Sequence, residues 1–335
     1  MRWQYVLGFL LVWATLTAVN LHWLIDDWYK FSFNLVKSYD LFNRLINIDY
    51  AKDPSYFLVQ AGLSGWLNFE LFFGLLILAC LSLKFAALLQ VTPRPGVLDV
   101  APYLLVLGFL HEGIQIRIAI ALSIAIWAIT FFSKNQRMLA FFILLLACTF
   151  HLSASAFFLV FLLFILYERF GLAVPALGIF SSGMLAYTTL VPDLLIRVGV
   201  ATNARFLAYS QGIAFENQNS TGLFHYFVLF VIFLTGFVWR YYKPISSVWS
   251  NLYRIALTSG FLAIAILQIF RFNVVVSSRL ADLLLLPVLL VLGATLTQLR
   301  SEKKYLPLWI MCLALIFYCA ARAFISFNPV LFRTF

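Results

Sequence analysis

Charged residues are scarce in this 335-residue chain, where Asp, Glu, Lys and Arg together make up 11% of the sequence. Soluble domains carry about 25% charged and about 45–50% apolar residues, whereas 64% of this chain is hydrophobic. A soluble fold cannot bury so much apolar surface, but a lipid bilayer accommodates it. The composition therefore excludes a soluble enzyme or binding module and predicts an integral membrane protein.

Cysteine is also rare, and the four present (Cys80, Cys148, Cys312 and Cys319) lie in apolar runs without CxxC spacing. His, Cys, Asp and Glu do not cluster at metal-ligand spacing, so we expect no metal site. No Walker loop, GxGxxG or GxSxG motif occurs, which argues against ATP-driven or serine-hydrolase chemistry, and we expect no cofactor. The net charge of +10 is not gathered into a dense basic run, so we expect no nucleic-acid partner.

Long apolar runs fill most of the chain. A helix needs about 20 apolar residues to cross the hydrocarbon core, and this criterion predicts an all-α, polytopic transmembrane bundle of about eleven spans in a single membrane domain, residues 1–335. The first run follows Arg2 without a small-residue cleavage site and is expected to be a retained anchor. The predicted spans are Tyr5–Leu24, Asn68–Leu89, Leu98–Leu110, Ile114–Phe132, Leu139–Phe150, Ser153–Tyr167, Leu172–Leu190, Leu223–Arg240, Leu252–Phe270, Leu280–Leu299 and Leu306–Phe324.

Basic residues predict the orientation of these spans. With the N-terminus inside, the inner side receives twelve of the 23 Lys and Arg, Lys84 among them, but only three of the 13 acids. Such an excess is typical of cytoplasmic loops. The two long polar loops, about residues 25–67 and 191–221, then lie outside, so the protein is expected to work on its outer face.

Residues 138–168 allow two interpretations. As one helix, these residues would span about 46 Å, which exceeds the membrane thickness. Arg137 and Arg169 flank the segment, and both are expected inside. We therefore predict two short helices with His151 at an outer turn; the alternative is one long tilted helix with His151 at membrane depth.

Polar residues at or near membrane depth mark four places, all expected on the outer side. Charged groups there cost several kcal/mol and usually serve a function. Each also has a structural explanation, since arginines can reach headgroups, Glu112 can pair with Arg117, and Asp282 with Arg279. The candidate residues are His111, Glu112 and Arg117; His151; Arg271, Arg279 and Asp282; and Arg205 in the second long loop.

Several arginines on an outer membrane face suit a lipid-linked phosphate or pyrophosphate. Guanidinium groups bind such oxyanions bidentately and keep their charge, and they can stabilise a departing pyrophosphate without a metal. A nearby His or carboxylate can take a proton from a sugar hydroxyl.

Short motifs around these residues resemble the EpsG-like branch of the Wzy-type bacterial polysaccharide polymerases. They are Arg117-Ile-Ala-Ile-Ala with the later Ala147-Cys-Thr-Phe-His-Leu-Ser-Ala segment, Asp53-Pro-Ser-Tyr-Phe, and Ser278-Arg-Leu. The chain departs from the family pattern in that Ile118 replaces a Gln and Asp53 a Glu.

The resemblance implies a GT-C-like, metal-independent glycosyltransferase of the bacterial inner membrane. Its donor and acceptor would be undecaprenyl-pyrophosphate-linked oligosaccharides, joined on the periplasmic face, and membrane lipid and a chain-length regulator protein would be its other partners. On this view Arg117 and Arg279 hold pyrophosphate, helped by Arg271 or Arg205. His151 positions or deprotonates the acceptor hydroxyl, and Glu112 is the rival base.

Three other functions remain open at this level. A lipid-linked oligosaccharide flippase would favour internal repeats and charges near the bilayer midplane, and neither is evident. A polysaccharide ligase would share the arginines and the outer loops. A membrane acyltransferase would require a His-Asp-type pair beside its acyl donor.

Overall fold

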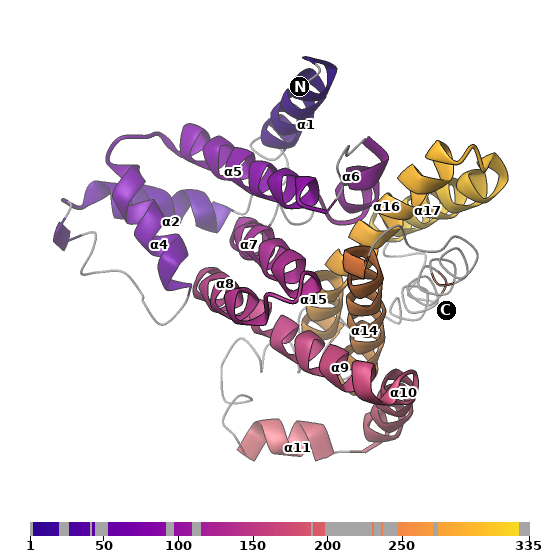
Figure 1. Cartoon of the computed structure of the whole chain (residues 1–335). Helices are drawn as coiled ribbons and strands as arrows, with labels where there is room; N and C mark the ends of the chain where they lie inside the picture. The colour runs from indigo at the N-terminus through magenta and orange to yellow at the C-terminus, as the bar shows by residue number, and fades with distance from the viewer. Residues whose placement is uncertain are drawn as a thin grey trace. The chain divides into compact units, whose positions relative to one another are not determined.

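The computed structural model describes residues 3–19, 27–40, 42–43, 53–91, 97–108, 115–188, 190–197, 230, 236, 247–270 and 274–327 (Figure 1). Within these ranges every regular element is a helix, which confirms the all-α prediction. The chain forms two compact units, Met1–Pro95 with Leu104–Ser155 and Gly96–Tyr103 with Ala156–Phe335.

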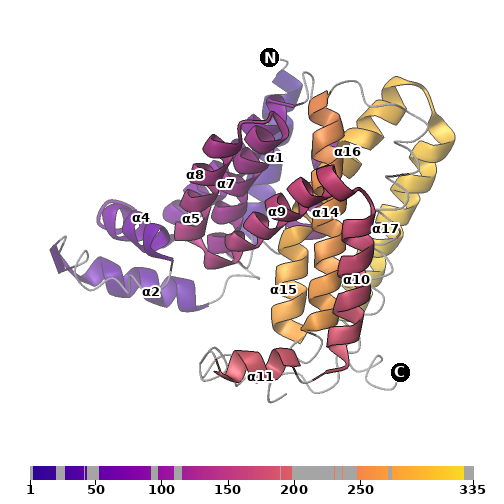
Figure 2. The same cartoon turned by 60° about the horizontal axis from the view of Figure 1, so that its bottom comes forward.

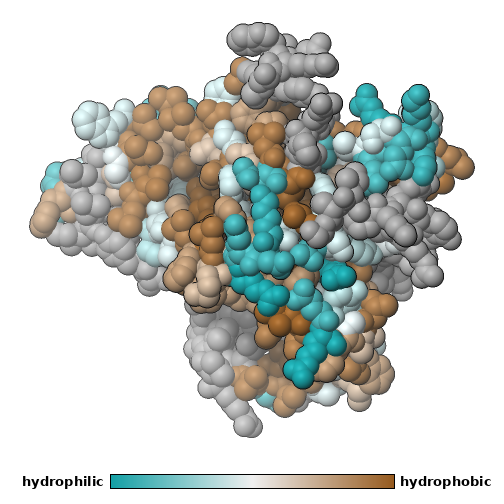
Figure 3. All heavy atoms as spheres, in the orientation of Figure 1, coloured by the Kyte–Doolittle hydropathy of each residue, from teal (hydrophilic) through white to brown (hydrophobic). Residues whose placement is uncertain are grey.

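Apolar helices of membrane-spanning character dominate both units. Among the described residues, four helices are long and apolar enough to cross a bilayer, namely Phe69–Leu89, Ile116–Ser133, Leu152–Phe170 and Val248–Ile269, and six shorter apolar helices accompany them. Hydrophobic side chains cover much of the visible surface, and hydrophilic ones gather in a few places (Figure 3). The chain is therefore a helical membrane protein. The count of eleven spans stays a prediction, and the predicted span Leu223–Arg240 falls almost entirely outside the described residues.

The first unit is built around two neighbouring long helices, α5 and α7. Helix α7 packs against α5 on one side and α8 on another, and large aromatic side chains fill the space around α5. Phe33 lies with its ring centroid 5.0 Å from that of Phe72 and 5.6 Å from that of Phe69. The elements are α1 (Trp3–Val19), α2 (Asp27–Ser38), α4 (Pro54–Ser64), α5 (Phe69–Leu89), α7 (Ile116–Ser133), α8 (Arg137–Phe150) and the 3-10 turn η3 (Leu152–Ser155).

The described part of the predicted outer loop of residues 25–67 includes the helices α2 and α4. Tyr29 and Phe33, spaced four residues apart, lie on one face of α2 and are buried, while Phe31 and Leu35 are exposed. This amphipathic pattern explains why a polar segment is ordered, since one apolar stripe packs on the core. Because α2 mixes polar and apolar residues, a search for long apolar runs does not detect this stripe.

The break predicted at His151 is confirmed. Helix α8 ends at Phe150, and His151 adopts an extended backbone with φ −161° and ψ 122°. The 3-10 turn follows, and α9 begins at Ala156. A single helix through residues 138–168 is therefore wrong, because an extended residue ends the helical hydrogen-bond ladder.

The second unit is centred on α14, which contacts α9, α10, α15 and α16. Figure 2 shows α10, α14 and α15 running side by side. Its elements are α6 (Val97–Tyr103), α9 (Ala156–Phe170), α10 (Ala173–Ala186), α11 (Leu190–Arg197), α14 (Ser247–Ile269), α15 (Val274–Leu284), α16 (Leu286–Ser301) and α17 (Tyr305–Phe327).

The predicted single span Leu280–Leu299 is divided between α15 and α16, which meet at Leu285. Pro287 stands in the first turn of α16. Proline has no N–H to continue a preceding helix and fits at a helix start, so it explains the division.

Helices α6 and α16 approach so closely that only glycine fits between them. A Cβ added to Gly293 would overlap the backbone carbonyl of Asp99. One turn further along α16, the Thr297 hydroxyl donates to the Asp99 carboxylate at 2.9 Å. Asp99 is 1% exposed, so this hydrogen bond compensates part of the cost of burying its polar side chain.

Candidate functional site

Arg117 is the second residue of α7 and lies where three elements of the first unit meet. Its neighbours Ile116 and Ala119 are buried in the core, which fixes the helix and directs Arg117 toward α2 and α4. The Arg117 Nη1 atom lies 2.5 Å from Asp53 Oδ2. The Arg117 Nε donates to the Tyr29 hydroxyl at 3.4 Å, and the guanidinium carbon lies 5.7 Å from the centre of the Tyr29 ring.

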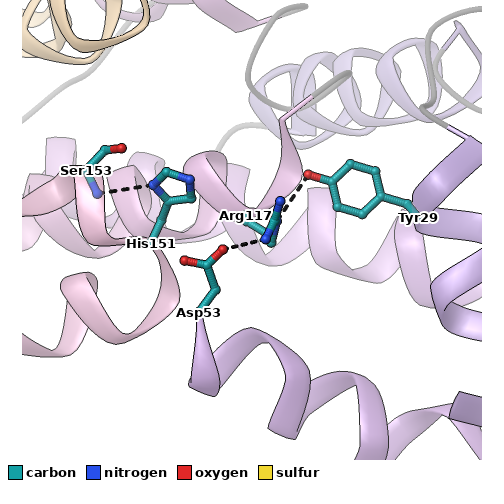
Figure 4. A network of polar contacts seen from close by, with 5 residues as sticks. All are labelled: Tyr29, Asp53, Arg117, His151 and Ser153. Atoms are coloured by element: carbon teal, nitrogen blue, oxygen red, sulfur yellow. Dashed lines mark hydrogen bonds and ion pairs between the residues drawn. The ribbon is translucent and has the colours of Figure 1, made fainter. Parts of the chain in front are cut away.

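Figure 4 shows the guanidinium of Arg117 between the Asp53 carboxylate and the Tyr29 ring. The Arg117 and Asp53 side chains are 19% and 10% exposed, respectively. Partial burial lowers the local dielectric and strengthens the ion pair relative to one in water. The pair is therefore only partly shielded from its surroundings.

Asp53 has a backbone conformation that few residues other than glycine adopt. It precedes Pro54 at the start of α4, with φ 50° and ψ 54°. An aspartate at a helix N-cap usually accepts a hydrogen bond from the first turn, but the Asp53 side chain makes no such bond. Its carboxylate is directed to Arg117 instead. Such left-handed conformations cost about 1–3 kcal/mol and often occur at functional sites.

A hydrogen bond joins α4 to the end of α8. The Ser55 hydroxyl donates to Thr149 Oγ1 at 2.7 Å, and the Thr149 hydroxyl donates to the Leu146 carbonyl at 2.7 Å. Because Ser55 and Thr149 are each two residues from Asp53 and His151, this bond brings His151 close to the Arg117–Asp53 pair.

His151 ends α8 and has a defined ring orientation. Its Nδ1 atom accepts a hydrogen bond from the Ser153 backbone N–H at 3.2 Å. In a neutral imidazole, a nitrogen that accepts leaves the proton on the other nitrogen, here Nε2. In Figure 4 His151 lies on the Asp53 side of Arg117, opposite Tyr29. In this state Nε2 carries the ring proton and cannot take up another.

Two aromatic residues, Tyr56 and Tyr29, pack beside the Arg117–Asp53 pair. Tyr56 is 2% exposed and its ring meets that of Tyr29 edge-on, with centroids 6.3 Å apart. It lies on α4, in the segment predicted as an outer loop. Burial raises the pKa of the Tyr56 hydroxyl above its ordinary value of 10.0. Tyr56 is therefore a neutral packing residue at physiological pH, and it holds Tyr29 against Arg117.

A second cation lies inside the first unit, at Lys84. The prediction placed Lys84 among the inner-loop residues, but it is 5% exposed and lies within α5. Its ammonium donates to the Ala119 carbonyl at 3.3 Å, in the first turn of α7. A flexible lysine stem allows this reach, which composition alone does not indicate.

The remaining predicted site residues fall into two groups. Arg279 and Asp282 lie on α15 in the second unit, where Arg279 is exposed and Asp282 is 5% exposed. His111, Glu112, Arg205 and Arg271 lie outside the described residues. The gathering of all these residues at one place stays a prediction, whereas Arg117 and His151 do lie close together.

Sequence reasoning missed Asp53 and Tyr29 as parts of the site. Asp53 was visible only as a member of a motif shared with a polymerase family, and Tyr29 had the ordinary appearance of an interfacial aromatic residue.

In the part of the chain that the structure describes, no three His, Cys, Asp or Glu side chains gather where they could hold a metal ion.

The sequence matches a known protein family over nearly its whole length. This match is to the EpsG family and covers residues 5–332. The chain belongs to the EpsG family. No curated protein and no solved structure matches it.

Membership of the EpsG family indicates a polysaccharide polymerase-like role. This agrees with the resemblance found in the Arg117, His151 and Asp53 segments. The match extends through both units, so the family assignment does not rest on the site residues alone.

Proposed function

We propose that this EpsG family member is a polysaccharide polymerase of the bacterial inner membrane. It transfers a glycan chain from polyprenyl pyrophosphate to the non-reducing end of a second lipid-linked repeat unit, on the outer face. The observation that carries the proposal is the partly exposed Arg117–Asp53 pair, with His151 close by, in a chain of this family.

Arg117 is the proposed pyrophosphate ligand. Guanidinium groups form paired hydrogen bonds with phosphate oxygens, and Asp53 and Tyr29 hold this one in a fixed orientation before substrate arrives. An entering pyrophosphate competes with Asp53 for the guanidinium. Fixed donors of this type stabilise the charge that develops on a leaving group.

In the proposed reaction, an acceptor hydroxyl oxygen attacks the anomeric carbon of the donor glycan. The bond from that carbon to the pyrophosphate oxygen breaks, and its electron pair leaves with polyprenyl pyrophosphate. The hydroxyl proton must pass to a base. Asp53 suits this task, because the pyrophosphate displaces its carboxylate from Arg117 while the substrate is bound.

For His151 we propose the first of its two predicted roles, positioning of the acceptor, rather than deprotonation. Since its Nδ1 accepts the Ser153 N–H, the proton of the neutral ring lies on Nε2, which then cannot act as a base. We assign His151 to positioning of the substrate. Glu112, which precedes α7 in the sequence, is proposed as the alternative base. The pyrophosphate of the acceptor unit is proposed to bind Arg279, Arg271 and Arg205. Asp282 is proposed to orient Arg279.

The test is a polysaccharide ladder from a strain that lacks this gene and is complemented with variants. Arg117→Ala should lower chain extension by about 10²–10³-fold, the effect of removing one donor to a developing charge. Arg117→Lys should recover only a small part, because an ammonium cannot bind bidentately. Arg137→Ala is the matched control, since Arg137 is an exposed arginine at the start of α8.

Each outcome distinguishes a function. Single repeat units in the deletion strain, with a ladder restored by the wild type, support a polymerase. Long chains that stay unattached to their final carrier indicate a ligase. Absence of lipid-linked units from the outer face indicates a flippase, and equal loss in Arg137→Ala would remove Arg117 from the site.

A further inference from the structure

A cavity of about 200 Å³ lies between α9, α10 and α14, within the second unit. We call it the three-helix cavity. Its lining includes Leu159 of α9, Gly178 and Ser182 of α10, and Phe261 and Ala265 of α14. A Cβ added to Gly178 meets nothing within 4 Å, so a larger side chain has room there.

The hydroxyl groups around the cavity already donate to other protein atoms. Ser181 donates to the Leu177 carbonyl at 2.5 Å, and Thr258 to the Arg254 carbonyl at 3.0 Å. Ser182 lies 2.6 Å from the Gln268 side-chain oxygen and donates to it. A polar ligand such as a sugar or phosphate therefore finds no hydroxyl donor on these three residues. An apolar ligand loses nothing by entering.

The length of the cavity matches that of a lipid chain within one leaflet. On α14 its lining extends from Thr258 to Ile269, which is about 16 Å along the helix at 1.5 Å per residue. The hydrocarbon core is about 30 Å thick, so one leaflet is about 15 Å. The cavity thus has the length of one leaflet, and it lies between helices of which two are long enough to cross the membrane.

Helix α10 also presents a surface that suits lipid. Apart from the residues that line the cavity, it carries Leu177, Phe180 and Met184, which are 65%, 66% and 61% exposed. Side chains of this kind remain at the surface of a membrane helix because hydrocarbon surrounds them. One helix of the cavity wall is therefore itself expected to lie against lipid.

We propose that the three-helix cavity binds one acyl chain of a membrane phospholipid, held as a fixed part of the second unit. The length of one leaflet favours a phospholipid chain, which itself reaches from headgroup to midplane. This site is independent of the polymerase reaction and of Arg117.

The test uses the full chain in nanodiscs of phosphatidylcholine that carries a photoreactive diazirine on one acyl chain. After illumination, the label is mapped by mass spectrometry on Phe261 and the buried Leu262, which also lines the cavity, and on exposed Leu313 of α17 for comparison. In the wild type, labelling of Phe261 and Leu262 should saturate as the diazirine lipid fraction rises. Labelling of Leu313 should rise in proportion to that fraction.

Gly178→Leu fills the cavity and should lower the labelling of Phe261 and Leu262 by about tenfold, the change in occupancy that a tenfold weaker affinity gives at low lipid fraction. Gly8→Leu is the matched control, because a Cβ at Gly8 in α1 also meets nothing within 4 Å. It should label like the wild type.

Two results overturn the proposal. Proportional, unsaturated labelling of Phe261 and Leu262 in the wild type would mean ordinary contact with bulk lipid, a conclusion that needs no variant to fold. Displacement of the label by excess unlabelled polyprenyl phosphate would assign the cavity to an isoprenoid chain instead.

Discussion

The region around Arg117 and the region around the three-helix cavity differ in how their polar side chains bond. Around Arg117 in the first unit, side chains bond across elements that are far apart in sequence: Arg117 meets Asp53 across 64 residues, and Ser55 meets Thr149 across 94. Around the three-helix cavity, Ser181 and Thr258 bond to carbonyls of their own helices, and of the three hydroxyl groups described there, Ser182 alone bonds to a side chain of another helix, that of Gln268. The first pattern fixes a set of chemical groups in space, whereas the second leaves a dry hydrocarbon surface. The same residue types therefore serve a site in one unit and packing in the other.

The largest expected effect on stability comes from Gly293 in the second unit. Gly293→Val places a branched side chain against the Asp99 backbone, which cannot move as a side-chain end can. Overpacking usually costs about 1–3 kcal/mol, and this substitution should reach the upper end of that range. Thermal unfolding of detergent-purified protein, followed by size-exclusion recovery, measures the loss.

Gly8→Val is the control for that measurement, because open space surrounds Gly8 in α1. A stability of Gly293→Val equal to that of the control would mean that α6 and α16 do not approach as closely as described.

The next expected effect is on chain extension and concerns Asp53, the carboxylate that pairs with Arg117 in the first unit. Asp53→Asn keeps the shape of the side chain but removes the charge opposite Arg117 and the proposed base. Chain extension should fall by about 10²-fold or more, as expected for loss of general base catalysis. Asp53→Glu should retain part of the activity. The measurement is the rate of ladder growth in membranes with matched protein levels.

Asp193→Asn on α11 of the second unit is an exposed control for Asp53→Asn. Unchanged ladder growth in Asp53→Asn would show that the carboxylate neither takes the proton nor orients Arg117.

Removal of single hydroxyl groups tests the contrast between the units directly. Ser55→Ala breaks the bond between α4 and α8 and should cost about 0.5–1.5 kcal/mol, with a moderate loss of chain extension. Ser181→Ala removes a bond within one helix and should change stability little. Both values come from unfolding midpoints, and equal effects in the two variants would contradict the contrast.

The smallest effect concerns pH and Tyr56. Because burial raises the pKa of Tyr56 above 10.0, the folded protein holds this proton at pH values where the unfolded chain loses it. Its contribution to stability is thus complete below pH 10 and declines as pH rises toward the folded pKa. Tyr56→Phe should flatten the decline of the unfolding midpoint between about pH 9 and 11. A decline equally steep in the variant would show that Tyr56 is not buried.

Part of the site could be found from sequence because charge is conspicuous in a membrane protein. Arg117 and His151 stand beside long apolar runs, where polar groups are costly. Asp53 lacks this signal, since it belongs to a polar segment where a carboxylate is ordinary. Lys84 was interpreted through the positive-inside pattern, but its flexible side chain turns inward to the Ala119 carbonyl.

The sequence by itself determined that this protein is an all-helical membrane protein, because composition and apolar run length depend only on the local chain. Its short motifs resembled the EpsG family, to which the chain belongs. The sequence also determined the helix break at His151. Tertiary structure alone decided which carboxylate meets Arg117. Spacing along a helix predicts only partners three or four residues away, whereas Asp53 reaches Arg117 through the packing of α2 and α4 on the aromatic core of the first unit.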